Sequence, residues 1–312
     1  MTEAPVTTAP RCAVASERAA EAMAGTAPEA SAWLAIEQSG PWGRQALTES
    51  HLDPEFGARI AFATHATGVK PLLIRRPGRH ADDHREPSSR NVWIAHTGPQ
   101  RPWLRHLTVH DLTELEALDF AAIGAGREPD IGTPDGAPLL LVCANARRDQ
   151  CCAIDGLPAA ADAAVAFPGR VWECSHLGGH RFSATAVQLP EGYVHGRLDG
   201  ASATAILLAA ERARVPVATL RGRSCLPAAA QAAEIAVRSW TGIEAIDALT
   251  SVDLAPGEND TGEHWTGGVT LSGSTHPVAV RTLAVAATRP ESCGKEPSVV
   301  RSFVVEPSPV TR

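Results

Sequence analysis

The segment from Leu139 to Leu198 restricts most strongly what this chain can fold into. It contains two cysteines, Cys143 and Cys152, with eight residues between them, and two histidines, His176 and His180, with three residues between them. Thiolate and imidazole side chains are ligands of zinc ions and of iron–sulfur clusters. The segment therefore predicts a site for a metal ion or a metal–sulfur cluster.

The hydrophobic pattern around these residues predicts alternating strands and helices. A strand is expected at 138–143, followed by a loop at 144–154 and a helix at 157–166. Three strands are then expected at 170–174, 183–189 and 193–199, and a second helix at 202–214. The resulting β–α–β–β–β–α order is close to that of a thioredoxin-like unit. Such α/β units place their ligands at the carboxyl ends of strands. Cys143 ends the expected strand at 138–143 and His176 follows the next one.

Two adjacent glycines separate the histidines in the string HLGGH. Because glycine disfavours a helix interior by roughly 1 kcal/mol, the histidines are not expected to be a helical pair. We predict instead a tight loop in which both imidazoles point the same way and the backbone comes close to a bound group. Three nearby arginines are expected to neutralise the charge of a cluster, namely Arg147, Arg148 and Arg181.

The whole sequence predicts an α/β protein with three parts. Residues 1–135 form the expected N-terminal α/β domain, 136–215 the thioredoxin-like domain and 216–312 a C-terminal α+β extension. Expected strands in the first part lie at 31–38, 71–76 and 91–98, and expected helices at 13–23, 44–49 and 110–124. The first of these strands and its GPWG turn echo the start of the central domain, so a second thioredoxin-like half is one interpretation of the N-terminal part.

Charge and hydropathy exclude several classes of partner. The net charge of the 312 residues is -7, which argues against nucleic acid or an anionic membrane as the main partner. No signal peptide and no apolar run of about 20 residues occur, so a cytoplasmic protein is expected. Disulfides are rare in that compartment, and the seven cysteines are therefore interpreted as ligands, redox thiols or buried bystanders.

Other uses of these cysteines remain open. A structural Cys2His2 zinc site is the main alternative, although zinc fingers place two to four residues between their cysteines. A thiol oxidoreductase would need a CxxC motif, which the segment lacks. Cys151 competes with Cys152 as a ligand, and Cys174 lies two residues before His176. Three further cysteines are either incidental thiols or a second site between the terminal segments: Cys12, Cys225 and Cys293.

The strings VCANARRDQCC, VWECSHLGGHRF and GRL resemble the sucrase/ferredoxin-like family, in particular its actinobacterial members. WLAIEQSGPWG and RGRSCLPAAAQAAEIAVR extend the resemblance over nearly the whole chain. The resemblance implies a thioredoxin-like ferredoxin domain with a [2Fe–2S] cluster that is not of the Rieske fold. By this resemblance Cys143 and Cys152 bind one iron, and His176 and His180 bind the other.

This resemblance implies a one-electron carrier rather than a stand-alone enzyme, and no catalytic residue is assigned. Neutral imidazoles make the oxidised cluster less negative, so an intermediate to high reduction potential is expected, coupled to pH through the histidines. A flavin- and NAD(P)H-dependent reductase is the expected redox partner. The alternatives are an enzyme that reduces a small molecule directly at the cluster and the structural zinc protein.

Overall fold

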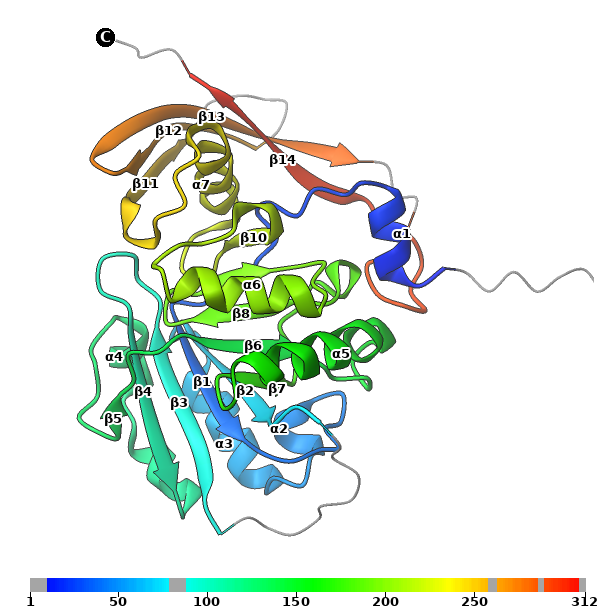
Figure 1. Ribbon diagram of the computed structural model, residues 1–312, viewed down its shortest axis with the longest axis vertical. Coiled ribbons are helices and arrows are strands. Elements are labelled where there is room, and N and C mark those ends of the chain that lie inside the picture. Colours follow the sequence, from blue (N-terminus) through cyan, green and yellow to red (C-terminus); the bar gives the residue numbers. More distant parts are fainter. Residues whose placement is uncertain (1–9, 79–87, 258–262, 286–288, 309–312) are drawn as a thin grey trace, which may run out of the picture.

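The computed structural model describes residues 10–78, 88–257, 263–285 and 289–308 (Figure 1). Within these residues ten strands form a mixed sheet, the larger sheet, in the order β10-β9-β8-β6-β7-β2-β1-β3-β4-β5. Four more strands form an antiparallel smaller sheet, in the order β11-β12-β13-β14. The predicted α/β fold is therefore confirmed. The polar residues 77–90, whose prolines and glycine indicate an exposed loop, lie mostly outside the described residues.

The middle of the chain forms one half of the larger sheet. Its strands are β6 (Leu139–Cys143), β7 (Val171–Cys174), β8 (Ala186–Leu189), β9 (Tyr193–His195) and β10 (Leu220–Arg223). β6 pairs parallel with β7 and antiparallel with β8, and β8 pairs antiparallel with β9. The helices α5 (Gln150–Ala166) and α6 (Gly200–Ala210) lie on the same face of this half (Figure 1). Both pack on a buried apolar cluster that includes Leu140, Val142 and Val171.

The N-terminal half repeats this topology. Its strands are β1 (Ala32–Glu37), β2 (Val69–Arg75), β3 (Arg90–His96) and β4 (Trp103–Val109), with α3 (Pro54–Thr64) between the first two. β1 pairs parallel with β2 and antiparallel with β3, which pairs antiparallel with β4. The order β2-β1-β3-β4 matches β7-β6-β8-β9, which supports the interpretation of a second thioredoxin-like half. The boundaries at 135/136 and 215/216 stay a prediction.

Antiparallel pairing between β2 and β7 joins the two halves. Ile74 lies opposite Cys174, and Arg75 lies opposite Glu173. The Arg75 guanidinium forms an ion pair of 2.7 Å with the buried Glu173 carboxylate. The junction therefore lies in the middle of the larger sheet, and its backbone hydrogen bonds are covered on both sides by neighbouring strands.

Several local predictions were wrong in detail. The predicted helix at 110–124 is two short helices, η1 (Leu112–Ala117) and α4 (Phe120–Gly124), because Asp111 and Asp119 each cap one of them. The sequence pattern also missed α3 and β4. The remaining short elements are α1 (Cys12–Arg18), α2 (Ala46–Glu49), β5 (Thr133–Pro134), η2 (His180–Phe182), η3 (Val217–Thr219) and η4 (Ile246–Ala248).

The start of α5 matters most among these differences. The sequence pattern predicted a loop as far as 154, but the helix begins at Gln150 because the Asp149 carboxylate accepts a hydrogen bond of 2.9 Å from the Cys151 amide. Cys151 and Cys152 therefore lie in the first helical turn. Similarly, α6 begins before the helix expected at 202–214, because the Asp199 side chain caps it by accepting a hydrogen bond from the Ser202 amide. Residues 221–223, for which the sequence pattern indicates no strand, belong to β10.

After β10, which belongs to the larger sheet, the C-terminal extension forms the smaller sheet and one helix. Its strands are β11 (Leu249–Pro256), β12 (His264–Leu271), β13 (Ser274–Val285) and β14 (Val300–Pro307), and α7 (Ala228–Thr241) packs against them. A tight hairpin turn joins β12 to β13, with Ser272 and Gly273 in the left-handed region. Pro227 precedes α7 and Gly242 ends it, as the sequence indicates. In the described part of the chain, no helix is long and apolar enough to cross a membrane.

A buried ionic network ties this extension to the larger sheet. The Tyr193 hydroxyl of β9 donates a hydrogen bond of 2.9 Å to the Glu234 carboxylate of α7. The Arg238 guanidinium donates to Glu234 at 2.8 Å and to the Tyr193 hydroxyl at 2.9 Å. It also donates to the carbonyls of Ile243 and Ala245, which lead into the smaller sheet. The Arg238 guanidinium thus holds all four of these partners.

Substitution of Arg238 tests this network. We expect Arg238→Met to lower the free energy of unfolding by about 3–5 kcal/mol, because it leaves a buried carboxylate without its partner. Arg214→Met, which breaks the exposed ion pair with Glu244, serves as a control and should change stability by less than about 1 kcal/mol. The measurement is urea denaturation of both variants. Equal losses would contradict a special role for the buried network.

Candidate metal centre

The four residues singled out in the sequence come from neighbouring elements at the carboxyl end of two inner strands of the larger sheet. Cys143 is the last residue of β6, and Cys152 lies in the first turn of α5. His176 follows β7 by two residues, and His180 begins η2. Because β6 and β7 are parallel and Cys143 lies opposite Cys174, the histidine loop starts beside the first cysteine. The structure thus brings all four side chains to the carboxyl ends of adjacent parallel strands.

Their donor atoms are in contact. The Cys152 sulfur lies 3.2 Å from His180 Nδ1. The imidazoles of His176 and His180 stack with ring centroids 4.8 Å apart and an angle of 21° between their planes. The Cys143 thiol interacts with both Cys152 and His176, and both interactions lower its pKa. The cysteines are buried and the histidines half-buried, so the thiol pair lies deeper than the imidazole pair.

Two glycines shape the histidine loop. Gly178 and Gly179 have φ angles of +83° and +75°, in the left-handed region that side chains other than glycine rarely adopt. These angles prevent a helix between the histidines and bring their rings face to face. The tight loop expected from HLGGH is what the structure contains.

The charge state of the site favours metal binding. The hydrogen bond with Cys152 holds the pKa of the Cys143 thiol well below its usual range, against the effect of burial and with help from His176. The pKa of Cys152 is raised because its proton is shared with the Cys143 sulfur. Burial lowers the pKa of His180, with a further contribution from His176, so this imidazole is neutral at pH 7. One thiolate and a neutral imidazole are the forms that metals bind.

A buried cation that interacts with the site was missed from the sequence. The Arg221 guanidinium of β10 is 2% exposed and donates a hydrogen bond of 2.9 Å to the Gly178 carbonyl. Burial lowers the pKa of Arg221 to about 9, and the charges of Cys143 and Cys152 partly offset this effect. The only sequence signal for this residue was the string RGR at 221–223, in which two arginines alternate with a glycine as they would in a strand. A buried arginine in a strand requires polar partners nearby, and the sequence does not show them.

The three arginines expected near the ligands have different roles. The charge of Arg148 contributes to the low pKa of His180. Arg181 forms an ion pair of 2.8 Å with Glu21 and lies over the Phe182 ring. No contact of Arg147 with the four residues is seen in the described part of the chain.

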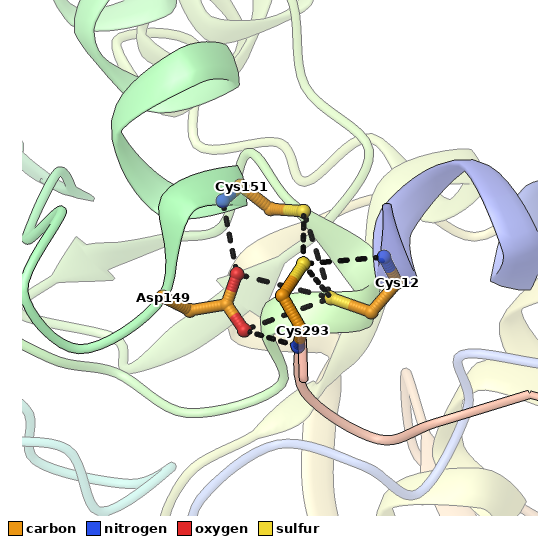
Figure 2. A group of neighbouring side chains, drawn as sticks. All are labelled: Cys12, Asp149, Cys151 and Cys293. Atoms are coloured by element: carbon orange, nitrogen blue, oxygen red, sulfur yellow. Dashed lines mark hydrogen bonds between the residues drawn. The ribbon is translucent and has the colours of Figure 1, made fainter. Parts of the chain in front are cut away.

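A second group of donor atoms lies near the first. The ligand atoms of Cys12, Asp149, Cys151 and Cys293 all lie within 4.8 Å of one another and could hold a metal ion (Figure 2). The hypothesis that Cys12 and Cys293 converge is therefore supported, with Cys151 and Asp149 as partners that the sequence did not indicate. Cys225 is not part of this group. Cys174 is fully buried in the core between the two halves.

The four central residues fit a metal–sulfur group. Two sulfurs and two ring nitrogens form the donor set, and His176 Nδ1 is buried with no hydrogen-bond partner in the structure. A buried polar atom without a partner is costly, which indicates that a bound group completes the site. These four residues are not among the described groups whose ligand atoms all lie within 4.8 Å of one another.

Comparison with known proteins gives one result. The model of the family described as sucrase/ferredoxin-like matches residues 23–222, which is more than half of the chain. Neither the curated proteins nor the solved structures include a match.

The glycine pair gives a matched test of the site. A Cβ at Gly179 would meet the Arg221 guanidinium, whereas a Cβ at Gly178 would have nothing within 4 Å. Both alanine substitutions should cost about 1–2 kcal/mol from the left-handed backbone. We expect Gly179→Ala to cost about 1–3 kcal/mol more, because Arg221 must move. Chemical denaturation measures the difference, and equal losses would show that Arg221 does not pack against this loop.

Proposed function

The chain belongs to the sucrase/ferredoxin-like family, and from that premise and the site geometry we propose that it is a [2Fe–2S] electron-transfer protein. Cys143 and Cys152 are the proposed ligands of one iron, and His176 and His180 those of the other. The observation that carries the proposal is the pairing of two buried thiols with two stacked imidazoles at the carboxyl ends of β6 and β7.

When bound, such a cluster supplies one-electron oxidation and reduction. The chain's own residues set the conditions for this chemistry. Cys143 and Cys152 hold the buried side of the site, and the half-buried His176 and His180 bring its other side toward the surface. Arg221 places a buried positive charge near the thiolates and so offsets part of their negative charge. Only two of the four proposed ligands are thiolates, and Arg221 adds a positive charge, so the bound cluster would be less negative and easier to reduce than one held by four thiolates.

The proposed electron donor is a flavin-dependent NAD(P)H reductase. The net charge of -7 suits a basic docking face on that partner. All seven cysteines are free thiols in the structure, which suits the reducing cytoplasm as the proposed location. The rival function, direct reduction of a small molecule, would show as turnover with a chemical reductant and no second protein.

The absorption and paramagnetic resonance spectra of the anaerobically purified protein test the proposal. We expect a coloured protein with two irons and two sulfides per chain, and a paramagnetic signal after one-electron reduction. Cys152→Ser should lose most of the colour, because it removes one of the two thiolates on that iron, whereas Cys151→Ser should retain it. A colourless zinc protein, or loss of colour only in Cys151→Ser, would refute this assignment.

Redox titration of histidine variants tests the imidazole ligands. The wild-type midpoint potential should fall as pH rises, because loss of an imidazole proton favours the more positive, oxidised cluster. The double variant His176→Cys with His180→Cys should titrate nearer to about −400 mV with no pH dependence, since thiolates replace the imidazoles.

The exposed His110 provides the control, since its imidazole forms a hydrogen bond with the Ser88 carbonyl and takes no part in either proposed metal site. His110→Cys should leave the midpoint potential and its pH dependence unchanged. A pH-independent wild-type potential near the plant-ferredoxin value would count against histidine ligation.

A further inference from the structure

Three sulfurs converge outside the proposed cluster site. The Sγ atoms of Cys12 and Cys151 are 3.5 Å apart, those of Cys151 and Cys293 are 3.5 Å apart, and those of Cys293 and Cys12 are 3.6 Å apart. The Asp149 carboxylate oxygens lie 3.7 and 3.9 Å from the Cys12 sulfur. Figure 2 shows the four side chains directed at a common centre, from α1, the start of α5 and the loop that precedes β14.

We propose that Cys12, Cys151, Cys293 and Asp149 bind one zinc ion in a tetrahedral structural site. A zinc–sulfur distance of about 2.3 Å places the sulfurs of a tetrahedron about 3.8 Å apart, and a carboxylate oxygen about 3.5 Å from each sulfur. The three observed sulfur separations are nearly equal and close to this value. A disulfide would join only two of the three sulfurs, whereas one ion accommodates all three.

The surroundings of Asp149 fit a ligating carboxylate. Its oxygens accept hydrogen bonds from the Cys151 amide at 2.9 Å, the Ser292 hydroxyl at 2.7 Å and the Cys293 amide at 2.8 Å. A carboxylate has about four lone-pair sites, so capacity remains for one metal bond. Hydrogen bonds of this kind orient metal ligands in proteins. The Cys12 amide also donates to the Cys293 sulfur at 3.4 Å, which stabilises a thiolate there.

The type of ion follows from the ligands and their burial. Zinc binds both thiolate sulfur and carboxylate oxygen in a tetrahedral array, whereas copper(I) prefers soft sulfur ligands and a multi-iron cluster would spread its thiolates over different irons. Cys12 and Cys151 are fully buried, and Asp149 is 5% exposed, so the site is closed as structural zinc sites are. Cys293 is half-exposed and provides the route by which an ion enters.

This site would join segments that are far apart in the sequence. Cys12 and Cys293 lie outside the residues matched by the family model, whereas Asp149 and Cys151 lie inside them. One ion would therefore fasten α1 and the 290–297 loop to the first turn of α5. The proposal is independent of the cluster, because the two sites share no residue and hold different metals.

Metal analysis of the full-length protein tests the proposal. We expect one zinc per chain in addition to the iron, counted separately by mass spectrometry of the elements. Cys12→Ser and Cys293→Ser should lose this zinc and keep the iron, and Cys225→Ser, a cysteine outside both sites, should keep both metals. Protein loaded with Co²⁺ in place of zinc should show thiolate-to-cobalt charge-transfer absorption, which the two variants should lack.

Alkylation of the wild-type protein decides the matter without any variant. With zinc bound, the half-buried Cys293 should resist iodoacetamide, and it should react after a chelator removes the ion. Cys12 and Cys151 are fully buried, so they should react only when the metal-free protein is also denatured. The proposal is overturned by a reactive Cys293 in zinc-free protein as purified, by a disulfide between any two of the three cysteines, or by iron in place of zinc.

Discussion

Parallel pairing of β6 with β7 is the interaction on which the proposed cluster site depends. It sets Cys143 opposite Cys174, so that the loop carrying both histidines leaves the sheet next to the first cysteine. The first turn of α5 brings Cys152 to the same end of these strands, where its sulfur meets His180. A shift of the register by one residue would turn Cys143 to the other face of the sheet and separate it from the imidazoles.

The first turn of α5 serves two groups of ligands. Cys151 and Cys152 are neighbours in the sequence, but successive side chains of a helix point about 100° apart. Cys152 therefore faces His180, whereas Cys151 faces Cys12 and Cys293. The Asp149 carboxylate starts this helix and also lies among the second group, so one residue determines the helix start and the position of both thiols. The two proposed metal sites thus share a rigid element without sharing a ligand.

Prediction from the sequence succeeded where the signal was local. Strands at 139–143, 171–174 and 186–189, the break in HLGGH and the caps of α7 depend on residues within a few positions of one another. Prediction failed for the start of α5, because the Asp149 cap competed with a loop-like composition, and for α3, although Asp53 and Pro54 form a helix start. Arg221 was missed because its partners, Thr26 and Gly178, are remote in the sequence.

The sequence by itself determined the donor types and the local geometry of the candidate centre: two cysteines, two histidines and a glycine pair that forces a tight loop. Spacing and residue type are enough for that, because they act over a few bonds. Only the tertiary structure decided that two halves of like topology share one sheet, that Arg221 lies buried beside the thiols, and that Cys12 meets Cys293 across 281 positions. Contacts at that separation arise from packing of the whole chain, and no local pattern records them.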